Sequence, residues 1–245
     1  MEKKPKYLIK GGKRLDGRKP EEFRKMKIST GVVKNADGSA VAEFGKTRVV
    51  AAVYGPRELH PRHMIMSNKA LVRVKYDMLS FSVEDRKRPG PGRREVEISK
   101  VLSEAFRNVV FTEKFPRAAI DVFVSVVQAD ASTRITGLNA ASVALADAGI
   151  PMRSLVTGMT FGKVYDGKGR GHVVVDVFKP EDQWGMADVA YARSYSTGEV
   201  VLLQMDGNMT KEEFLKGKEM ADKAIDAVYK EQVRALKEKY VEGLE

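Results

Sequence analysis

Apolar residues alternate with other residues in several short stretches of the chain, which is the pattern of a strand that buries one face. The clearest case is residues 120–126, where every second residue is Ile or Val. Three apolar stretches between residues 26 and 54 predict a meander of strands, because an Asp-Gly step at 37–38 and a Gly-Lys step at 45–46 suit turns. Further strands are predicted at 71–78, 154–165, 172–179, 186–194 and 200–205.

Apolar residues recur at helical spacing in three other stretches. Residues 98–109 carry one apolar stripe, and residues 137–148 carry another that is rich in alanine and is followed by Gly149 and Pro151, a plausible stop. A long third helix is predicted from Thr210, whose spacing to Glu213 matches a capping box.

The predicted order of elements is strands, helix, strand, helix, strands and helix. This order indicates an α+β fold, a single compact domain of two similar strand and helix halves that ends in a long C-terminal helix. We expect residues 15–240 to form this domain. Residues 1–14 are expected to be a basic, partly flexible N-terminal arm, and residues 241–245 a C-terminal tail.

Composition indicates a class of partner. The 245 residues include 43 Lys and Arg against 33 Asp and Glu, a formal net charge of +10 that makes a polyanion such as nucleic acid a natural ligand. The chain has no cysteine, which excludes disulfides, a thiol nucleophile and cysteine-ligated zinc. No apolar run approaches the roughly 20 residues of a membrane helix, so we expect a cytoplasmic protein with no membrane partner.

The tripeptide Gly45-Lys46-Thr47 resembles the end of a nucleotide-binding P-loop. That motif requires another glycine where this chain has Ala40, and it requires a helix afterwards, whereas residues 48–53 are predicted as a strand. A Walker-type ATPase is therefore rejected.

The junction between the strand at 120–126 and the alanine-rich helix is a candidate anion site. A short polar loop there would present the hydroxyls of Ser132 and Thr133, backbone N–H groups at a helix start, and the guanidinium of Arg134. Phosphate is the most obvious ligand. The alternative is an ordinary turn in which Ser or Thr caps the helix and Arg134 forms a surface ion pair.

Two other basic segments suit nucleic acid. Arg93 and Arg94 follow a basic Pro/Gly linker and lie in the first turn of a predicted helix, an unfavourable place for cations unless an anion binds between them. Arg62 and His63 lie in a basic loop at 57–69, which either contacts a nucleic-acid backbone or is simply exposed. His60 and His63 are three apart but lack nearby acidic ligands, so a metal site is not expected there.

Four carboxylates lie between residues 176 and 188 of this basic chain. Asp182 and Asp188 would face one pocket if the Trp184-Gly185 segment turns. Two carboxylates near a phosphate suit Mg²⁺, and one carboxylic acid could instead donate a proton to a leaving alkoxide. The alternative is a loop of solvated acids anchored by Trp184.

Taken together, six motifs resemble the RNase PH family, and within it the catalytic ring subunit of the archaeal exosome. They are Arg14-Leu15-Asp16-Gly17-Arg18, Gly38-Ser39-Ala40 with Gly45-Lys46-Thr47, Arg93-Arg94-Glu95-Val96-Glu97-Ile98, Gln128-Ala129-Asp130 to Arg134, residues 144–152, and Glu181-Asp182 with Asp188. The resemblance extends from about Leu15 to the C-terminal helix.

The resemblance implies a phosphorolytic 3′→5′ exoribonuclease, in which inorganic phosphate as co-substrate releases nucleoside diphosphates from RNA, and which can extend RNA in reverse. It implies that Ser132, Thr133 and Arg134 hold the attacking phosphate. Arg93 and Arg94 would hold RNA near its 3′ end, while Arg62 and His63 would line the RNA path.

The resemblance also implies that Asp182 is the general acid and that Asp188 lies beside it. Both carboxylates would then be available to Mg²⁺. The implied partners are RNA, a related inactive ring subunit in an alternating hexamer, and a cap of RNA-binding proteins. Two alternatives stay open, namely a non-catalytic RNA-binding ring subunit and a homohexamer that trims tRNA 3′ ends.

The chain departs from the family pattern at Ser132, where the family usually has glycine. A side chain at this position would either crowd the anion or add a hydroxyl donor. The sequence leaves both outcomes open.

Overall fold

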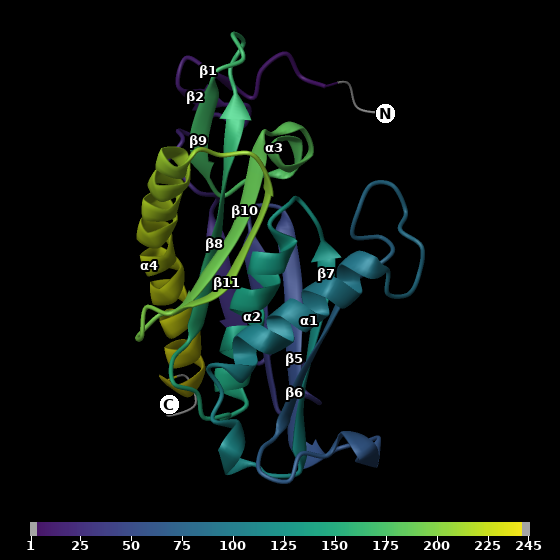
Figure 1. Cartoon of the computed structure of the whole chain (residues 1–245). Helices are drawn as coiled ribbons and strands as arrows, with labels where there is room; N and C mark the ends of the chain where they lie inside the picture. The colour runs from purple at the N-terminus through teal and green to yellow at the C-terminus, as the bar shows by residue number, and fades with distance from the viewer. Residues whose placement is uncertain (1–3, 242–245) are drawn as a thin grey trace.

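Five strands form the larger of two main sheets in the computed structural model, which describes residues 4–241 (Figure 1). The strands lie in the order β3 (Met26–Thr30), β4 (Gly38–Phe44), β5 (Thr47–Glu58), β7 (Ala118–Gln128) and β6 (Leu71–Met78). Neighbours are antiparallel except β6 and β7, which are parallel and are joined through helix α1 (Arg93–Arg107). Short 3-10 turns at Arg62–Met64 and Thr112–Lys114 lie in the connections.

The second main sheet has four antiparallel strands. Their order is β11 (Val200–Gly207), β10 (Ala187–Ser194), β8 (Val156–Tyr165) and β9 (Gly171–Val175). A small hairpin of β1 (Ile9–Lys10) and β2 (Lys13–Arg14) lies at the β9 end of this sheet, where Ile9 bridges to Asp166.

Helix α2 (Thr133–Asp147) lies between the sheets, in contact with β4, β5 and β7 on one side and with β8 on the other. Nearly all of its residues are buried, which explains why small residues replace a one-sided apolar stripe. Gly137 is required by this packing, because a Cβ there would stand 2.7 Å from Cγ1 of Val124. The core therefore holds the start of α2 in a fixed place.

The long helix α4 (Lys211–Val241) covers β8, β9 and β3. Its start has the predicted capping box, in which Glu213 accepts a hydrogen bond from the Thr210 N–H at 2.9 Å and Thr210 Oγ1 accepts one from the Glu213 N–H at 3.3 Å. Each main sheet is thus followed in the chain by a long helix, and the predicted α+β fold with a long C-terminal helix is confirmed.

One element was predicted wrongly. The strand expected at 172–179 ends at Val175, and helix α3 (Lys179–Trp184) occupies the segment that was predicted as the end of that strand and a loop of acids. Pro180 in the first turn of α3 suits a helix start. Six residues are too few to display a helical repeat in the sequence, so the pattern gave no signal for it.

The N-terminal segment contacts the domain at residues that were assigned to a basic arm. Leu8 and Ile9 are buried against Val164 and Val174, and Arg14 is 3% exposed. Of the predicted tail, Val241 ends α4 and residues 242–245 lie outside the described part of the chain.

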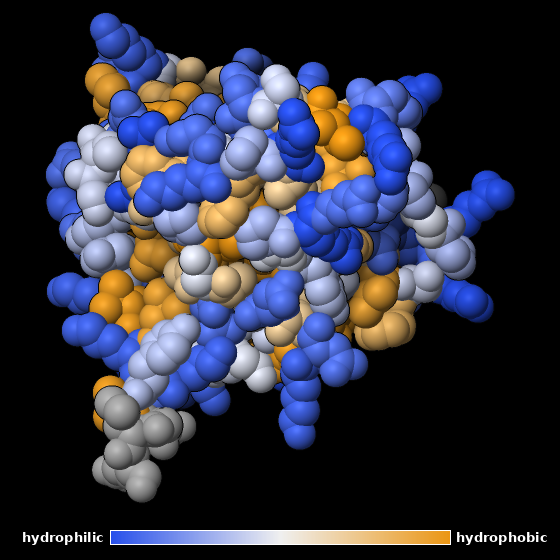
Figure 2. Space-filling model, turned by 90° about the horizontal axis from the view of Figure 1, so that it is seen from below, coloured by the Kyte–Doolittle hydropathy of each residue, from blue (hydrophilic) through white to orange (hydrophobic). Residues whose placement is uncertain are grey.

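The molecular surface combines charged and apolar regions. Seen from the lower end of Figure 1, hydrophilic side chains surround several separate apolar patches (Figure 2). Among residues 4–241, no helix combines the length and apolar character needed to cross a membrane. The cytoplasmic location stays a prediction.

Candidate active site

The loop between β7 and α2 has an unusual backbone. Ala131 and Ser132 both have positive φ, at 57° and 55°, a conformation that side-chain-bearing residues seldom adopt. Thr47 fixes the loop, because its Oγ1 accepts a hydrogen bond from the Asp130 N–H at 3.0 Å and donates one to the Ala131 carbonyl at 2.8 Å. The last residue of the Gly-Lys-Thr tripeptide thus anchors this loop.

The structure explains how a serine occupies position 132. Its Oγ donates to the Val177 carbonyl at 2.7 Å and lies 2.8 Å from Oγ1 of Thr160, so the side chain points towards β8 and the segment after β9. The hydroxyl is therefore neither in the way of an anion at the start of α2 nor a free donor to it. Ser132 precedes the helix without a side-chain capping bond, and it serves the loop through its backbone.

Thr133 and Arg134 begin helix α2. The N–H groups of a first helical turn have no partner within the helix, and they carry the positive end of the helix dipole. Thr133 is buried, and its Oγ1 accepts a hydrogen bond from the Tyr76 hydroxyl at 2.9 Å.

Arg134 carries a buried donor with no partner. Within residues 4–241, its Nε has no hydrogen-bond partner. Burial lowers the pKa of Arg134; Glu97 and Asp188 oppose this shift, and the like charge of Arg94 adds to it. A buried donor left without a partner is costly, so an anion bound at this guanidinium would remove that cost.

Arg94 belongs to the same cluster. It lies on the exposed first turn of α1, as predicted, and its charge acts on Arg134, Asp182 and Asp188. Arg93 is exposed on the same turn. The two arginines thus begin a helix at the edge of the cluster.

Asp182 on α3 and Asp188 on β10 lie close enough for their charges to interact. Burial raises the pKa of Asp188 to about 7, the charge of Asp182 adds to this rise, and Arg134 and Arg94 oppose it. Desolvation by neighbouring protein atoms also raises the pKa of Asp182, although this residue lies on the exposed side of α3. Because both pKa values are raised, each carboxyl group keeps its proton to a higher pH than an ordinary aspartate and can donate it to a leaving oxygen.

The chain is similar to known proteins over most of its length. A model of the 3′ exoribonuclease family, domain 1, matches residues 22–151, which is more than half of the chain. The chain belongs to the 3′ exoribonuclease family. This is the RNase PH family that the motifs resemble, so the family prediction is confirmed.

Relatives in the 3′ exoribonuclease family match over nearly their full length. The exosome complex component Rrp41 of Methanopyrus kandleri is 56% identical over 98% of this chain and 99% of its own. The components of the same name from Pyrococcus furiosus and Archaeoglobus fulgidus are 52% and 50% identical, over 96% and 98% of this chain and 92% of each relative. The crystal structure of rice (Oryza sativa) Rrp46 superposes with a TM-score of 0.79 over 91% of this chain and 100% of that one; at 23% identity it supports the fold alone.

Three residues of the candidate site were not singled out from the sequence. Asp206, near the end of β11, lies directly opposite Asp188 in the β10–β11 pairing, and its charge raises the pKa of both predicted acids. Glu97 and Tyr76 act on Arg134. A strand pairing of β10 with β11 would have revealed Asp206, because cross-strand partners share a face.

Arg62 and His63 are exposed and lie far from the acids. Their 3-10 turn follows Glu58, which pairs with Ala118 at the start of β7. The loop between β7 and α2 follows Gln128 at the other end of β7. Ten residues of strand span about 33 Å. These two residues are therefore not part of the reacting centre.

The acidic cluster alone is not a complete metal site. Among the described residues, no group of three or more His, Cys, Asp or Glu side chains is arranged to hold a metal ion. Asp182 and Asp188 supply the hard oxygen ligands that Mg²⁺ takes together with waters and phosphate oxygens. These two residues thus fit a metal ion only if substrate oxygens complete its coordination.

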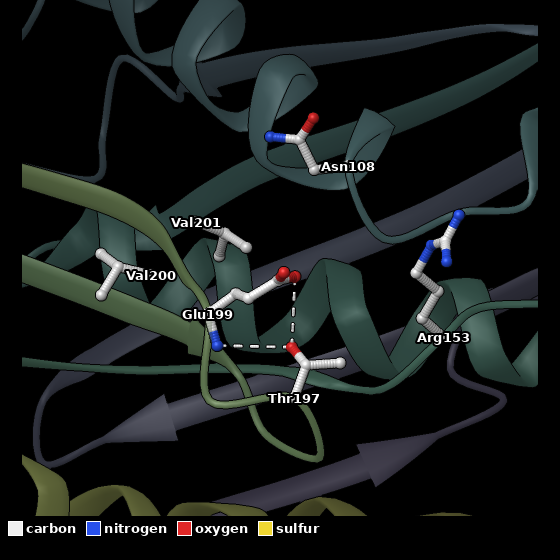
Figure 3. A pocket seen from close by; sticks show the side chains of 6 residues that line it. All are labelled: Asn108, Arg153, Thr197, Glu199, Val200 and Val201. Carbon is white, nitrogen blue, oxygen red and sulfur yellow. Dashed lines mark hydrogen bonds between the residues drawn. The ribbon is translucent and has the colours of Figure 1, made fainter.

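A separate hollow of about 700 Å³ lies near the turn between β10 and β11 (Figure 3). It is lined by Asn108, Arg153, Thr197, Glu199, Val200 and Val201. Thr197 and Glu199 are linked to each other by hydrogen bonds at 3.3 and 3.4 Å (Figure 3). None of the predicted site residues lines this hollow.

Proposed function

We propose that this chain is the phosphorolytic 3′→5′ exoribonuclease subunit of an exosome of the archaeal type. The observation that carries the proposal is the unpartnered, buried Nε of Arg134 beside two acids of raised pKa, at the start of a helix. The near full-length similarity to exosome components named Rrp41 supports the assignment to that complex.

Inorganic phosphate would bind at the start of α2. Arg134 would neutralise its charge, and the backbone N–H groups of Thr133 and Arg134 would donate hydrogen bonds to its oxygens. Ser132 would contribute its backbone, because its hydroxyl is used by Val177. Two anions at about 4 Å repel by about 4 kcal/mol per charge pair at an effective dielectric of 20, so fixed cations are needed here.

The reaction is a displacement at phosphorus. An oxygen of phosphate attacks the last phosphodiester of the RNA, and the bond between phosphorus and O3′ of the preceding nucleotide breaks. The electron pair of that bond stays on O3′, which takes a proton from Asp182. The products are a nucleoside 5′-diphosphate and an RNA shortened by one nucleotide, and the reverse reaction extends RNA from nucleoside diphosphates.

Arg93 and Arg94 would bind the RNA backbone next to the scissile bond, since α1 presents both at its exposed start. Arg62 and His63 would contact RNA upstream, because their loop lies at the other end of β7. The charge of +10 supports binding of a polyanion along this length.

Mg²⁺ would be held by Asp188 together with substrate oxygens, and Asp182 would be available as a further ligand once it has given up its proton. It would neutralise charge on the phosphate groups. Bound metal would also keep Asp188 ionised.

The proposed assembly is a hexameric ring in which this chain alternates with a related inactive subunit beneath RNA-binding cap proteins. The edge strand β11 supports the need for a partner, because Val200, Leu203 and Met205 on it are each 50% exposed.

The test is a phosphate-dependence assay on RNA labelled near its 3′ end, with the chain alone and with its ring partner. We expect nucleoside diphosphates only when phosphate is present. Products that form equally well without phosphate would exclude phosphorolysis.

The Asp182→Asn variant separates the alternatives. We expect loss of activity with RNA binding retained, whereas a non-catalytic ring subunit would leave the assembled complex fully active. Full activity of the purified chain without a partner would instead support the self-sufficient homohexamer.

A further inference from the structure

A buried ion pair holds helix α3 against the N-terminal segment. The side chains of Arg14 and Glu181 are both fully buried, and they form a two-pronged pair in which Nε of Arg14 donates to Oε1 at 2.8 Å and Nη2 donates to Oε2. Glu181 is the buried residue of this six-residue helix, and Asp182 is its immediate neighbour. The place of Asp182 therefore depends directly on the place of Glu181.

Arg14 uses all five of its N–H donors. Besides the two bonds to Glu181, Nη1 donates to the Val175 carbonyl at 2.6 Å and to the Glu22 carbonyl at 3.2 Å, and Nη2 donates to the Asp176 carbonyl at 2.7 Å. A guanidinium with every donor engaged has one orientation, whereas a lysine has three donors on a flexible stem. Arg14 thus joins α3 to the end of β9 with fixed geometry.

Arg24 joins the segment after β9 to the loop between β7 and α2. It binds both oxygens of Asp176, with Nη2 at 2.7 Å from Oδ1 and Nε at 2.9 Å from Oδ2, and its Nη1 donates to the Asp130 carbonyl at 2.6 Å. Asp130 directly precedes the two loop residues of positive φ.

Asp176 is the common point of both links. It is fully buried with a φ of 54°, and Arg18 binds its Oδ2 at 3.0 Å. Burial alone would raise the pKa of Asp176, but the hydrogen bonds and the charge of Arg24 hold it below the usual range. The carboxylate therefore stays charged and bonded while its backbone keeps an unfavourable conformation.

We propose that Arg14 and Arg24 are positioning residues. Through Glu181, Asp176 and Asp130 they set the distance between Asp182 and the loop that joins β7 to α2, at which phosphate is proposed to bind. The inference rests on the proposed function, in which Asp182 is the general acid. Trp184 packs against the cluster around Val164 and Val177, and the buried ion pair of Glu181 is a second contact that holds α3 in place.

Buried ion pairs contribute more to positioning a segment than to the stability of the folded protein. Replacing a buried pair by apolar residues of similar size often leaves stability unchanged or raises it, whereas removing one partner leaves a costly unpaired charge. A misplacement of about 1 Å at a reacting centre costs about 100-fold in rate. The pair of Arg14 and Glu181 is thus expected to affect the rate of phosphorolysis more than the stability of the fold.

The test uses the double variant Arg14→Met/Glu181→Met, assembled with the ring partner. Because neither charge is left unpaired, we expect its Tm to stay within about 5 °C of the wild-type value. We expect kcat for phosphorolysis to fall by about 100-fold while KM for RNA and for phosphate changes by less than about threefold. The Arg14→Lys variant keeps the charge and should recover only part of kcat.

The matched control is Arg193→Met, which removes an arginine that pairs with Asp226 on α4 at 3.2 Å. We expect its kcat to equal that of the wild type. The proposal is overturned if the double variant and Arg14→Lys both keep kcat within about threefold of the wild type, or if their loss appears in KM alone.

Asp182→Asn in the same assay distinguishes this failure from that of the proposed function. If Asp182→Asn is inactive while both Arg14 variants are unaffected, the positioning role alone is wrong. If Asp182→Asn is fully active, the general-acid assignment is wrong, and the positioning role is wrong with it.

Discussion

The substitution Asp188→Asn is expected to stabilise the folded protein at neutral and alkaline pH, although it removes a group from the site. Burial raises the pKa of Asp188 to about 7 from the ordinary value of 3.8, with Asp182 adding to the rise. The folded protein therefore binds more protons than the unfolded chain between these two values, and its stability falls as the pH rises through that range. Asparagine is neutral at every pH and lacks this cost.

The size of the effect follows from the pKa. A rise from 3.8 to about 7 is about 3 pKa units, or about 4 kcal/mol at the pH where the group is fully charged in both states. Asp188 is only partly buried, so screening by solvent reduces this to about 2 kcal/mol. For a chain of this size that corresponds to about 4–8 °C in Tm.

The assay is thermal unfolding of wild type and variant between pH 4 and pH 9, with EDTA present so that no metal ion stabilises the wild-type site. We expect the advantage of the variant to be close to zero at pH 4 and to grow until about pH 8. The Asp226→Asn variant, which changes an exposed aspartate on α4, controls for the loss of charge. An advantage that is the same at every pH, or a variant that is less stable at pH 8, would refute the reasoning.

Three further predictions concern the anion site, the central helix and the larger sheet. Arg134→Met is expected to raise the KM for phosphate by about 10- to 100-fold, because a charge-assisted hydrogen bond contributes about 1.5–3 kcal/mol; an unchanged phosphate KM would argue against its role. Gly137→Ala is expected to lower the free energy of unfolding by about 1–3 kcal/mol, because the new Cβ would stand 2.7 Å from Val124, whereas Gly167→Ala, which meets nothing within 4 Å, should leave the Tm unchanged. Burial would raise the pKa of Asp121, but its bonds to Arg73 and Arg57 lower it below 3.8, so Asp121→Asn should lower the Tm at pH 7, and the difference should disappear as the pH falls below 3.8. A difference that stays constant as the pH falls from 7 into the acid range would contradict that assignment.

The sequence could predict those elements whose pattern repeats over enough residues. The alternation at 120–126 and the stripes of α1 and α4 have many periods, so their type was predicted correctly, and the turn at 45–46 was placed correctly between β4 and β5. Helix α3 could not be predicted, because six residues show no period and because the interaction that places it joins Arg14 to a residue 167 positions away.

The sequence predicts which residues form the candidate site but not how their side chains are arranged. The grouping of Asp182, Asp188 and Arg134 follows from motifs, and the structure brings their charges together. The direction of the Ser132 side chain depends on a positive φ that a serine rarely adopts, and the contribution of Asp206 depends on strand register. Neither property is visible in a local pattern of apolar and polar residues.

Helix α2 has a consequence for the cooperativity of folding. It packs on β4, β5 and β7 on one side and on β8 on the other, and Asn139 within it exchanges hydrogen bonds of 2.9 and 3.0 Å with the backbone of Gly158. Neither sheet can lose its order without exposing the apolar surface of this shared helix. Calorimetry should therefore detect a single unfolding transition whose van't Hoff and calorimetric enthalpies agree, and the slowest amide hydrogen exchange should be found in the middle of α2.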